Sequence, residues 1–206
     1  AVEEPAGTDI LINGARDFGL IEIETSKLLT FTVRNNGDQP LSLSGTPRVA
    51  ISGTNAADFT VTKQPEDTVA AKGTTTFTIQ FAPSAVAGPR SAKLSIANND
   101  SNEDPFEINL SGAGGLPPEI AVEQPAGTNI ANNGPKDFGN VGLGLNNSLT
   151  FTIRNSGDLP LNLSGAPLVA ISGTNAADFE VTKQPDASVA AKGSATFIVR
   201  FAPSDV

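Results

Sequence analysis

The chain of 206 residues contains no cysteine, histidine, methionine, tryptophan or tyrosine. Without cysteine there is no disulfide, no thiolate nucleophile and no cysteine-ligated zinc. Without histidine the commonest general base and metal ligand is missing, which excludes serine–histidine and cysteine–histidine catalysis. The composition does not exclude a two-carboxylate hydrolase or an enzyme with a lysine nucleophile, but no pattern in the sequence points to a catalytic residue. We therefore expect a protein that is not an enzyme and has no cofactor and no metal site.

Positive charge and long apolar runs are also scarce. The 13 lysines and arginines stand against 22 acidic residues, for a net charge of −9. Nucleic-acid phosphates require clustered lysine and arginine, so we expect no nucleic-acid partner. No apolar run approaches the roughly 20 residues that cross a bilayer, so we expect no transmembrane segment. The absence of cysteine also suits an extracellular location.

What the sequence does contain is a long internal repeat. The phrase ISGTNAADF at residues 51–59 returns letter for letter at 171–179, and LTFTVRNNGD at 29–38 returns as LTFTIRNSGD at 149–158. Every matching segment is offset by 120 positions, and about two thirds of the aligned positions are identical. Solenoid repeats run about 20–50 residues, so a period this long predicts tandem domains.

Glycine and proline mark the boundary between the repeats. We predict repeat 1 over residues 1–113, a glycine/proline linker over 114–118 and repeat 2 over 119–206. Repeat 2 has no counterpart of residues 87–115, which contain the last two predicted strands of repeat 1. Two hypotheses follow: further residues complete repeat 2, or another chain donates the strands. Under both, the expected partners are neighbouring copies or adjacent repeats, in a homopolymer or a tandem array.

Alternating apolar and polar residues dominate each repeat, as in LTFTVR, FTIQF, AKLSIAN and FEINL. This period of two predicts half-buried antiparallel strands. Turn residues separate the strands at 36–38, 71–73 and 98–105. About seven short strands per repeat predict an all-β protein of tandem immunoglobulin-like sandwiches, with the second copy truncated.

The repeated phrase ISGTNAADF fits a corner between two strands. Ile51 ends one strand, and Phe59 begins the next and enters the core. Between them we expect Asn55 to cap a single helical turn, with Asp58 close to the capping-box position. The alternative is a binding loop that uses Asn55 and Asp58. The structural corner is favoured.

Longer stretches resemble a known family. The segments TFTVRNNGDQPLSLSG, ISGTNAADF, TFTIQFAPS and AKLSIANNDSNEDPFEINLSGAG resemble the ASH-type (abnormal-spindle/Hydin) immunoglobulin-like repeat. They are more closely similar to its bacterial version in secreted "choice-of-anchor D" proteins. The resemblance spans nearly all of repeat 1 and all of repeat 2 that is present. It implies tandem modules in large exported or surface proteins, and it carries over no catalytic residue.

One loop has the residue spacing of a calcium site. Asp100, Asn102 and Asp104 alternate like calcium ligands. However, Pro105 stands where an EF-hand needs glycine, and the twelfth position is Ser111, which cannot supply a bidentate carboxylate. We therefore interpret residues 100–105 as a polar hairpin loop.

The remaining motifs are local. Asparagine-glycine pairs at residues 13–14 and 133–134 predict turns. Glycosylation sequons occur at Asn99, Asn109, Asn146 and Asn162. We interpret the sequons as coincidental, because Asn109 and Asn162 fall inside predicted strands.

We predict a structural role: a filament subunit, stalk or adhesin spacer of a bacterial extracellular or cell-surface protein. Strand complementation between subunits is one route of assembly. The alternative is a ligand- or carbohydrate-binding accessory module. Sugar binding usually presents flat aromatic faces, but tyrosine and tryptophan are absent and the phenylalanines sit at inward strand positions. A third hypothesis comes from the ASH-type resemblance: in ciliary and centrosomal relatives such domains dock cytoskeletal partners, and this chain would do the same.

Overall fold

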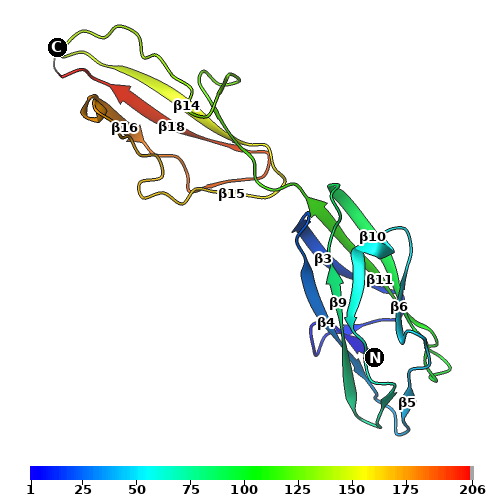
Figure 1. Cartoon of the computed structure of the whole chain (residues 1–206). Coiled ribbons are helices and arrows are strands. Elements are labelled where there is room, and N and C mark those ends of the chain that lie inside the picture. The colour runs from blue at the N-terminus through cyan, green and yellow to red at the C-terminus, as the bar shows by residue number, and fades with distance from the viewer. Residues whose placement is uncertain (205–206) are drawn as a thin grey trace. The chain divides into compact units, whose positions relative to one another are not determined.

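The computed structural model of the chain describes residues 1–204. The chain divides into two compact units, Ala1–Gly115 (unit 1) and Leu116–Val206 (unit 2) (Figure 1). Nearly all regular structure is β-strand, which confirms the predicted all-β, immunoglobulin-like sandwich class.

Unit 1 is a sandwich of two sheets. The first sheet has the strand order β2-β1-β4-β9-β7, with bounds Asp9–Ile10, Val2–Glu3, Lys27–Arg34, Thr74–Phe81 and Phe59–Lys63. The second has the order β3-β11-β10-β6, with bounds Gly14–Glu22, Phe106–Gly115, Gly88–Ile96 and Val49–Ser52. A short pair, β5 (Leu41–Ser42) and β8 (Thr68–Val69), lies beside them. All pairs are antiparallel except β3 with β11, which is parallel.

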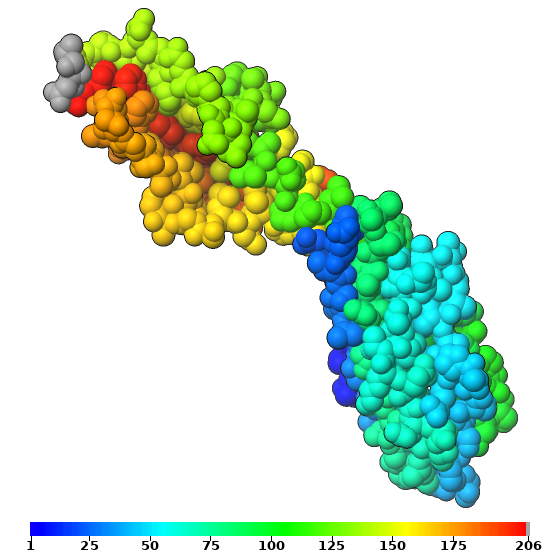
Figure 2. Space-filling view, viewed as in Figure 1, coloured from blue at the N-terminus to red at the C-terminus, as the bar shows by residue number. Residues whose placement is uncertain are grey.

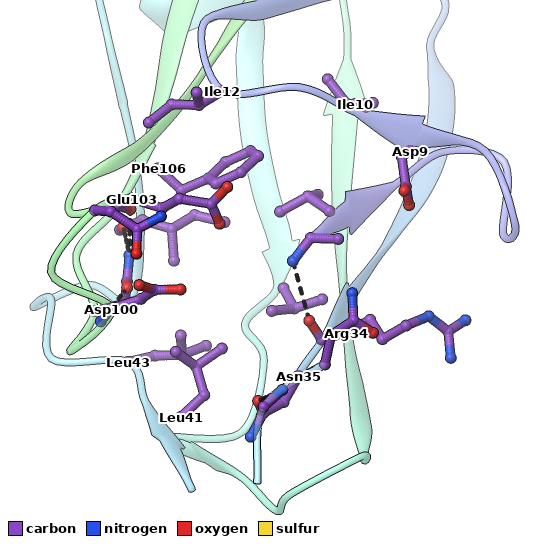
Figure 3. A pocket seen from close by; sticks show the side chains of 18 of the residues that line it. Asp9, Ile10, Ile12, Arg34, Asn35, Leu41, Leu43, Asp100, Glu103 and Phe106 are labelled. Atoms are coloured by element: carbon purple, nitrogen blue, oxygen red, sulfur yellow. Dashed lines mark hydrogen bonds between the residues drawn. The ribbon is translucent and has the colours of Figure 1, made fainter. Parts of the chain in front are cut away.

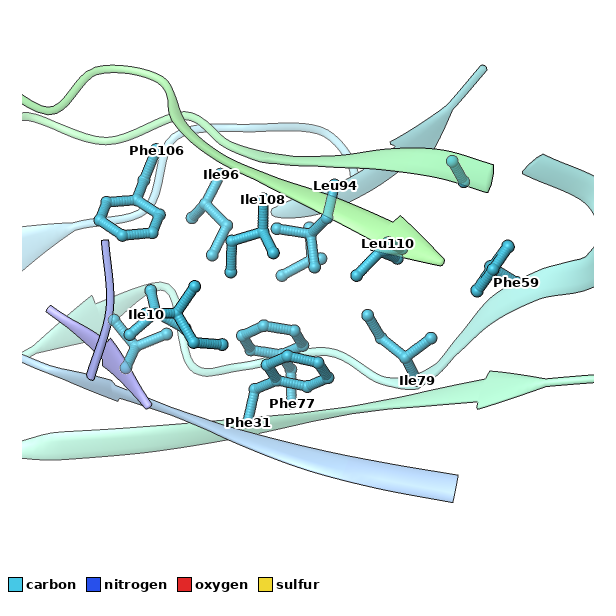
Figure 4. Packing of buried hydrophobic residues seen from close by; sticks show 14 of the residues in the cluster. Ile10, Phe31, Phe59, Phe77, Ile79, Leu94, Ile96, Phe106, Ile108 and Leu110 are labelled. Carbon is cyan, nitrogen blue, oxygen red and sulfur yellow. The ribbon is translucent and has the colours of Figure 1, made fainter. Parts of the chain in front are cut away.

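The core of unit 1 follows from the alternation in the sequence. Phe31 of β4 lies directly opposite Phe77 of β9, and their rings stack with centroids 5.0 Å apart. Leu94 of β10 and Ile108 of β11 face this pair from the second sheet (Figure 4). One apolar layer therefore joins the two sheets.

The corner at ISGTNAADF is confirmed as a single helical turn. The 3₁₀-helix η1 spans Ala56–Asp58, and Phe59 is buried, with its ring stacked 4.7 Å from that of Phe81.

The predicted cap of this turn is wrong. Asn55 makes no side-chain cap; its Oδ1 accepts from the backbone N–H of Ser91 instead (3.0 Å). Asp58 accepts from Nε of Arg90 (2.6 Å). Both side chains bind to β10 because this strand lies against η1 and offers them hydrogen-bond donors, the Arg90 side chain and the Ser91 backbone. The corner thus ties η1 to the second sheet.

The predicted linker is shorter in the structure. Gly114 and Gly115 continue β11, where they pair with Ile21 and Glu22 of β3. The parallel ladder with β3 extends the strand through both glycines, which the sequence pattern assigned to the linker.

Unit 2 forms one five-stranded sheet that corresponds strand by strand to the first sheet of unit 1. Its order is β13-β12-β14-β18-β16, with bounds Asn129–Ile130, Ile120–Glu123, Asn147–Asn155, Ser194–Phe201 and Phe179–Lys183. A pair, β15 (Leu161–Asn162) and β17 (Ser188–Val189), and the 3₁₀-helix η2 (Ala176–Asp178) complete the regular structure of the described part.

Identical sequence adopts different structure in the two units. VAIS at 49–52 is strand β6, whereas VAIS at 169–172 is not a strand. In unit 1 this segment pairs with β10, and β3 pairs with β11. Within residues 116–204 neither the β3 counterpart at 134–142 nor the β6 counterpart forms a ladder. Both segments therefore depend on partner strands.

Each unit contains the same ion pair, in which the glutamate is buried and the arginine is partly exposed. Glu3 accepts from Nε of Arg34 (2.5 Å) and from the backbone N–H of Gly7 (2.7 Å). In unit 2, Glu123 is bound in the same way by Arg154 and Gly127. The arginine hydrogen bond first, and then the backbone N–H, hold the pKa of both glutamates below the ordinary value.

These pairs predict a loss of stability in acid. A lowered pKa contributes stability that is present above the ordinary glutamate pKa of about 4.3 and is lost as the pH falls through the folded-state value. We expect the variant carrying Glu3→Gln and Glu123→Gln to melt below the parent at pH 7, and the difference to shrink below about pH 4. Calorimetry from pH 7 to pH 2.5 measures this. A difference that stays constant over that range would contradict the prediction.

Candidate functional site

Unit 2 has an apolar hollow on the inner face of its sheet. The hollow has a volume of about 310 Å³ and lies over Phe151 and Phe197. These rings sit directly opposite one another on β14 and β18 and stack with centroids 5.0 Å apart. We call this site the phenylalanine hollow. Its full lining is Val122, Ile130, Ala131, Asn132, Asn133, Gly134, Lys136, Phe151 and Phe197.

The same phenylalanine pair is covered in unit 1. Phe31 and Phe77 are completely buried there, while Phe151 and Phe197 retain 7% and 8% exposure. Figure 2 shows the stretch that follows β14, in yellow and orange, at the surface of unit 2. In the core of unit 2, most of the surrounding apolar side chains are only partly buried. The hollow therefore lies where unit 1 places the side chains of β10 and β11.

Unit 1 has a separate cleft of about 600 Å³ at one end of the sandwich. Phe106 and Ile10 line one part, and Leu41 and Leu43 another (Figure 3). Asp100 is one of the polar residues at the cleft, as are Asp9, Glu103, Arg34 and Asn35. Because Arg34 is bound to Glu3, the charges offered to a ligand are mainly carboxylates. The cleft holds neither a nucleophile nor a flat exposed aromatic face.

The predicted polar hairpin loop at residues 100–105 is organised by hydrogen bonds of its own. It joins β10 to β11, and Asp104 accepts from the backbone N–H of Asn98 (2.9 Å). Asn98 in turn accepts from the N–H of Asp100 (2.8 Å) and donates to the carbonyl of Glu103 (2.9 Å). Among residues 1–204 no group of three or more acidic side chains is placed to hold a metal ion.

The asparagines singled out in the sequence are scattered over both units. Asn109 and Asn162 lie in β11 and β15, as expected. Asn13 and Asn133 have left-handed backbone angles, φ 59° and 62°, which fits the predicted turns. The other two sequon residues, Asn99 and Asn146, are exposed in loops. The fold does not bring these residues together into one site.

Sequence reasoning missed a buried asparagine in each unit. The Nδ2 of Asn35 donates to the carbonyls of Gln39 (2.7 Å), Val69 (3.1 Å) and Ala70 (3.2 Å). Asn155 makes the same three kinds of bond in unit 2. The available signal was an asparagine retained in both repeats beside a Gly-Asp turn. This side chain connects the turn after β4 or β14 to another loop.

The sandwich and its corner turn define the class of protein. The fold is an immunoglobulin-like β-sandwich of the ASH type. Residues 13–115, half of the chain, match the family model of Cep192 domain 4, and the chain belongs to this family. No curated protein sequence matches it. Within residues 1–204 there is no helix with the length and apolar character to cross a bilayer.

The solved structures to which the chain is similar share little sequence with it. The ASH/PapD-like domain of human CEP192 (PapD-like domain 7) has 15% identity and a TM-score of 0.39, covering 56% of this chain and 86% of that one. WR4, an MSP family member of C. elegans, has 16% identity and a TM-score of 0.32, with coverage of 48% and 91%. A protein of unknown function from Porphyromonas gingivalis W83 has 14% identity and a TM-score of 0.35, with coverage of 98% and 83%.

Proposed function

We propose that the chain is a non-enzymatic structural repeat module of a bacterial extracellular or cell-surface protein, acting as a filament subunit, stalk or adhesin spacer. A PapD-like β-sandwich points to a structural or interaction module. The proposed partners are copies of the same repeat, in a tandem array or a homopolymer. The proposal includes no cofactor and no metal.

The phenylalanine hollow is the observation that carries this proposal. In unit 1, β10 and β11 fill the equivalent space with aliphatic side chains such as Leu94 and Ile108 (Figure 4). Each such side chain contributes about 1.5–3 kcal/mol when fully buried. Added strands also supply partners for the backbone groups of residues 134–142 and 169–172. Unit 2 is therefore suited to accept two strands of the β10–β11 kind, from a following segment or from a neighbouring subunit.

Covalent completion of unit 2 tests this proposal. A variant carries a copy of residues 87–115 joined after Val206. We expect the amides of residues 169–172 that pair with the added strand to become protected from hydrogen exchange, as we also expect of those of β6 that pair with β10 in unit 1. The control carries the same extension with the copies of Leu94 and Ile108 replaced by aspartate. Equal protection in the parent, the variant and the control would contradict the proposal.

Sedimentation velocity then separates the two sources of strands. If neighbouring subunits donate them, the 206-residue chain assembles as its concentration rises and the completed variant does not. If the strands come from a tandem array, the 206-residue chain stays monomeric and the completed variant is only stabilised.

A further inference from the structure

The first residues of unit 2 are hydrogen-bonded to a turn of the same unit. Residues 116–119, Leu-Pro-Pro-Glu, which we call the connector, lie beside residues 155–158, which we call the turn strip of unit 2. The backbone N–H of Leu116 donates to Oδ2 of Asp158 (2.9 Å), and the N–H of Asp158 donates to the carbonyl of Leu116 (3.0 Å). A hydrogen bond from Lys192, and then the one from Leu116, lower the pKa of Asp158.

The other end of the connector is held equally well. The N–H of Ser156 donates to the carbonyl of Glu119 (2.9 Å), and the N–H of Glu119 donates to Oδ1 of Asn155 (3.1 Å). Between these ends, Pro117 and Pro118 offer no N–H and favour extended backbone. The connector is therefore bound as an extended proline-rich segment, through backbone groups at both of its ends.

Close approach at the middle of the strip requires glycine. A Cβ on Gly157 would overlap the carbonyl oxygen of Pro117 and lie 2.7 Å from Cα of Pro118. Any side chain at this position would push the connector away.

Unit 1 has the same strip, but it is open. Residues 35–38 are Asn-Asn-Gly-Asp, and Lys72 binds the Asp38 carboxylate (2.8 Å) as Lys192 binds Asp158 (2.8 Å). The side chain of Asp38 is 87% exposed, compared with 28% for Asp158. Glycine 37 is exposed where its counterpart in unit 2 is buried. The strip of unit 1 thus presents at the surface the groups that are covered in unit 2.

The hydrogen-bonding groups of the open strip match those used in unit 2. Across residues 1–204 nothing accepts a hydrogen bond from the backbone N–H of Asn36 or Asp38, the counterparts of two donors that bind the connector. In unit 2 the side-chain oxygens of Asn155 and Asp158 accept from the connector. Their counterparts in unit 1, Asn35 and Asp38, are the same residue types. Val2 pairs with Val33 as Val122 pairs with Ile153, so chain ahead of Ala1 would emerge beside the strip as the connector does.

We propose that residues 35–38 of unit 1 form a docking site for an extended Leu-Pro-Pro-Glu segment that is followed by one residue and then by residue 1, as Ile120 separates the connector from Ala121. This inference rests on the proposed array of repeats: every repeat would be entered through the same docked connector. A docked connector fixes where the chain enters a repeat, without using the sandwich core. The strip is thus a recognition site for backbone in extended conformation.

An N-terminal extension tests the proposal. Leu-Pro-Pro-Glu-Ile is added ahead of Ala1 in the otherwise unchanged chain. We expect the amides of Asn36 and Asp38 to exchange at least tenfold more slowly, as followed by NMR. The Gly37→Ala substitution should abolish this protection, because its Cβ would occupy the place of the first proline. Without the extension, the exchange rates of the Gly37→Ala variant serve as its own baseline, because the new Cβ would lie 3.2 Å from Oδ1 of Asn35 and 4.0 Å from the Gln39 nitrogen.

Two controls complete the experiment. An extension of Leu-Gly-Gly-Glu-Ile should protect less, because its glycines are not held extended. In unit 2, Gly157→Ala should speed exchange of the Ser156 and Asp158 amides at least tenfold, because it expels the bound connector.

Two results would overturn the proposal: no protection by the extension, or protection that survives Gly37→Ala. The signals come from residues 35–38 and not from the phenylalanine hollow. Failure here is therefore distinguishable from failure of the strand-completion experiment, which is read at residues 169–172.

Discussion

Replacing Asn35 with alanine is expected to destabilise unit 1 by about 3 kcal/mol. The substitution removes the amide that serves the carbonyls of Gln39, Val69 and Ala70, and the Oδ1 that accepts from Gly37 (2.9 Å). Each lost hydrogen bond costs about 0.5–1.5 kcal/mol, and a buried acceptor left without a partner costs about 1–3 kcal/mol. Because Val69 is buried, water cannot fully replace the amide at its carbonyl.

Urea denaturation measures this loss, with Asn36→Ala as the matched control. Asn36 is exposed, and its substitution should stay within about 0.5 kcal/mol of the parent. The chain has neither tryptophan nor tyrosine, so hydrogen exchange at amides of β9 and β18 reports on the two units separately. Asn155→Ala should lower the stability of unit 2 in the same way. Equal effects of the Asn35 and Asn36 substitutions would contradict the assigned role.

The buried strands were the most predictable part of the fold. Alternation places Phe31 and Phe77 at inward positions, and the structure puts them directly opposite one another. A period of two is a local signal, because successive side chains of a strand point to opposite faces. The parallel pairing of β3 with β11 has no comparable local signal, since it depends on which segments meet in space.

Partner strands decide structure that local sequence leaves open. The identical VAIS segments at 49–52 and 169–172 show this directly, because only the first has β10 beside it. Asn55 is a similar case: its sequence context predicts a cap, but the nearby backbone of Ser91 is the better partner. Both differences arise from contacts between segments distant in sequence, which propensity does not contain.

The candidate sites differ in how far sequence reveals them. The inward positions of Phe151 and Phe197, over which the phenylalanine hollow lies, follow from the alternation of residues in β14 and β18. The open strip at residues 35–38 does not follow, because its residues closely match those of the occupied strip. The two strips differ in the coverage of Gly37 and Gly157 and of Asp38 and Asp158, and coverage is a property of the folded chain.

Substituting Gly112 with alanine is expected to destabilise unit 1 by about 2 kcal/mol. A Cβ at this position of β11 would lie 2.6 and 2.8 Å from two ring carbons of Phe81. This ring is completely buried, stacks on Phe59 and packs 5.6 Å from the ring of Phe18, so it has no room to move. Overpacking of this kind costs about 1–3 kcal/mol.

A double-mutant cycle with Phe81→Leu isolates the clash. The leucine variant alone loses aromatic packing and should cost about 1–2 kcal/mol. In the double variant the smaller side chain makes room for the new methyl group, so the combined loss should fall below the sum of the two single losses by at least 1 kcal/mol. Additive losses would mean that Gly112 is needed for another reason. The coupling measured between these two positions therefore tests whether Gly112 of β11 is required because the Phe81 ring of the opposite sheet packs against it.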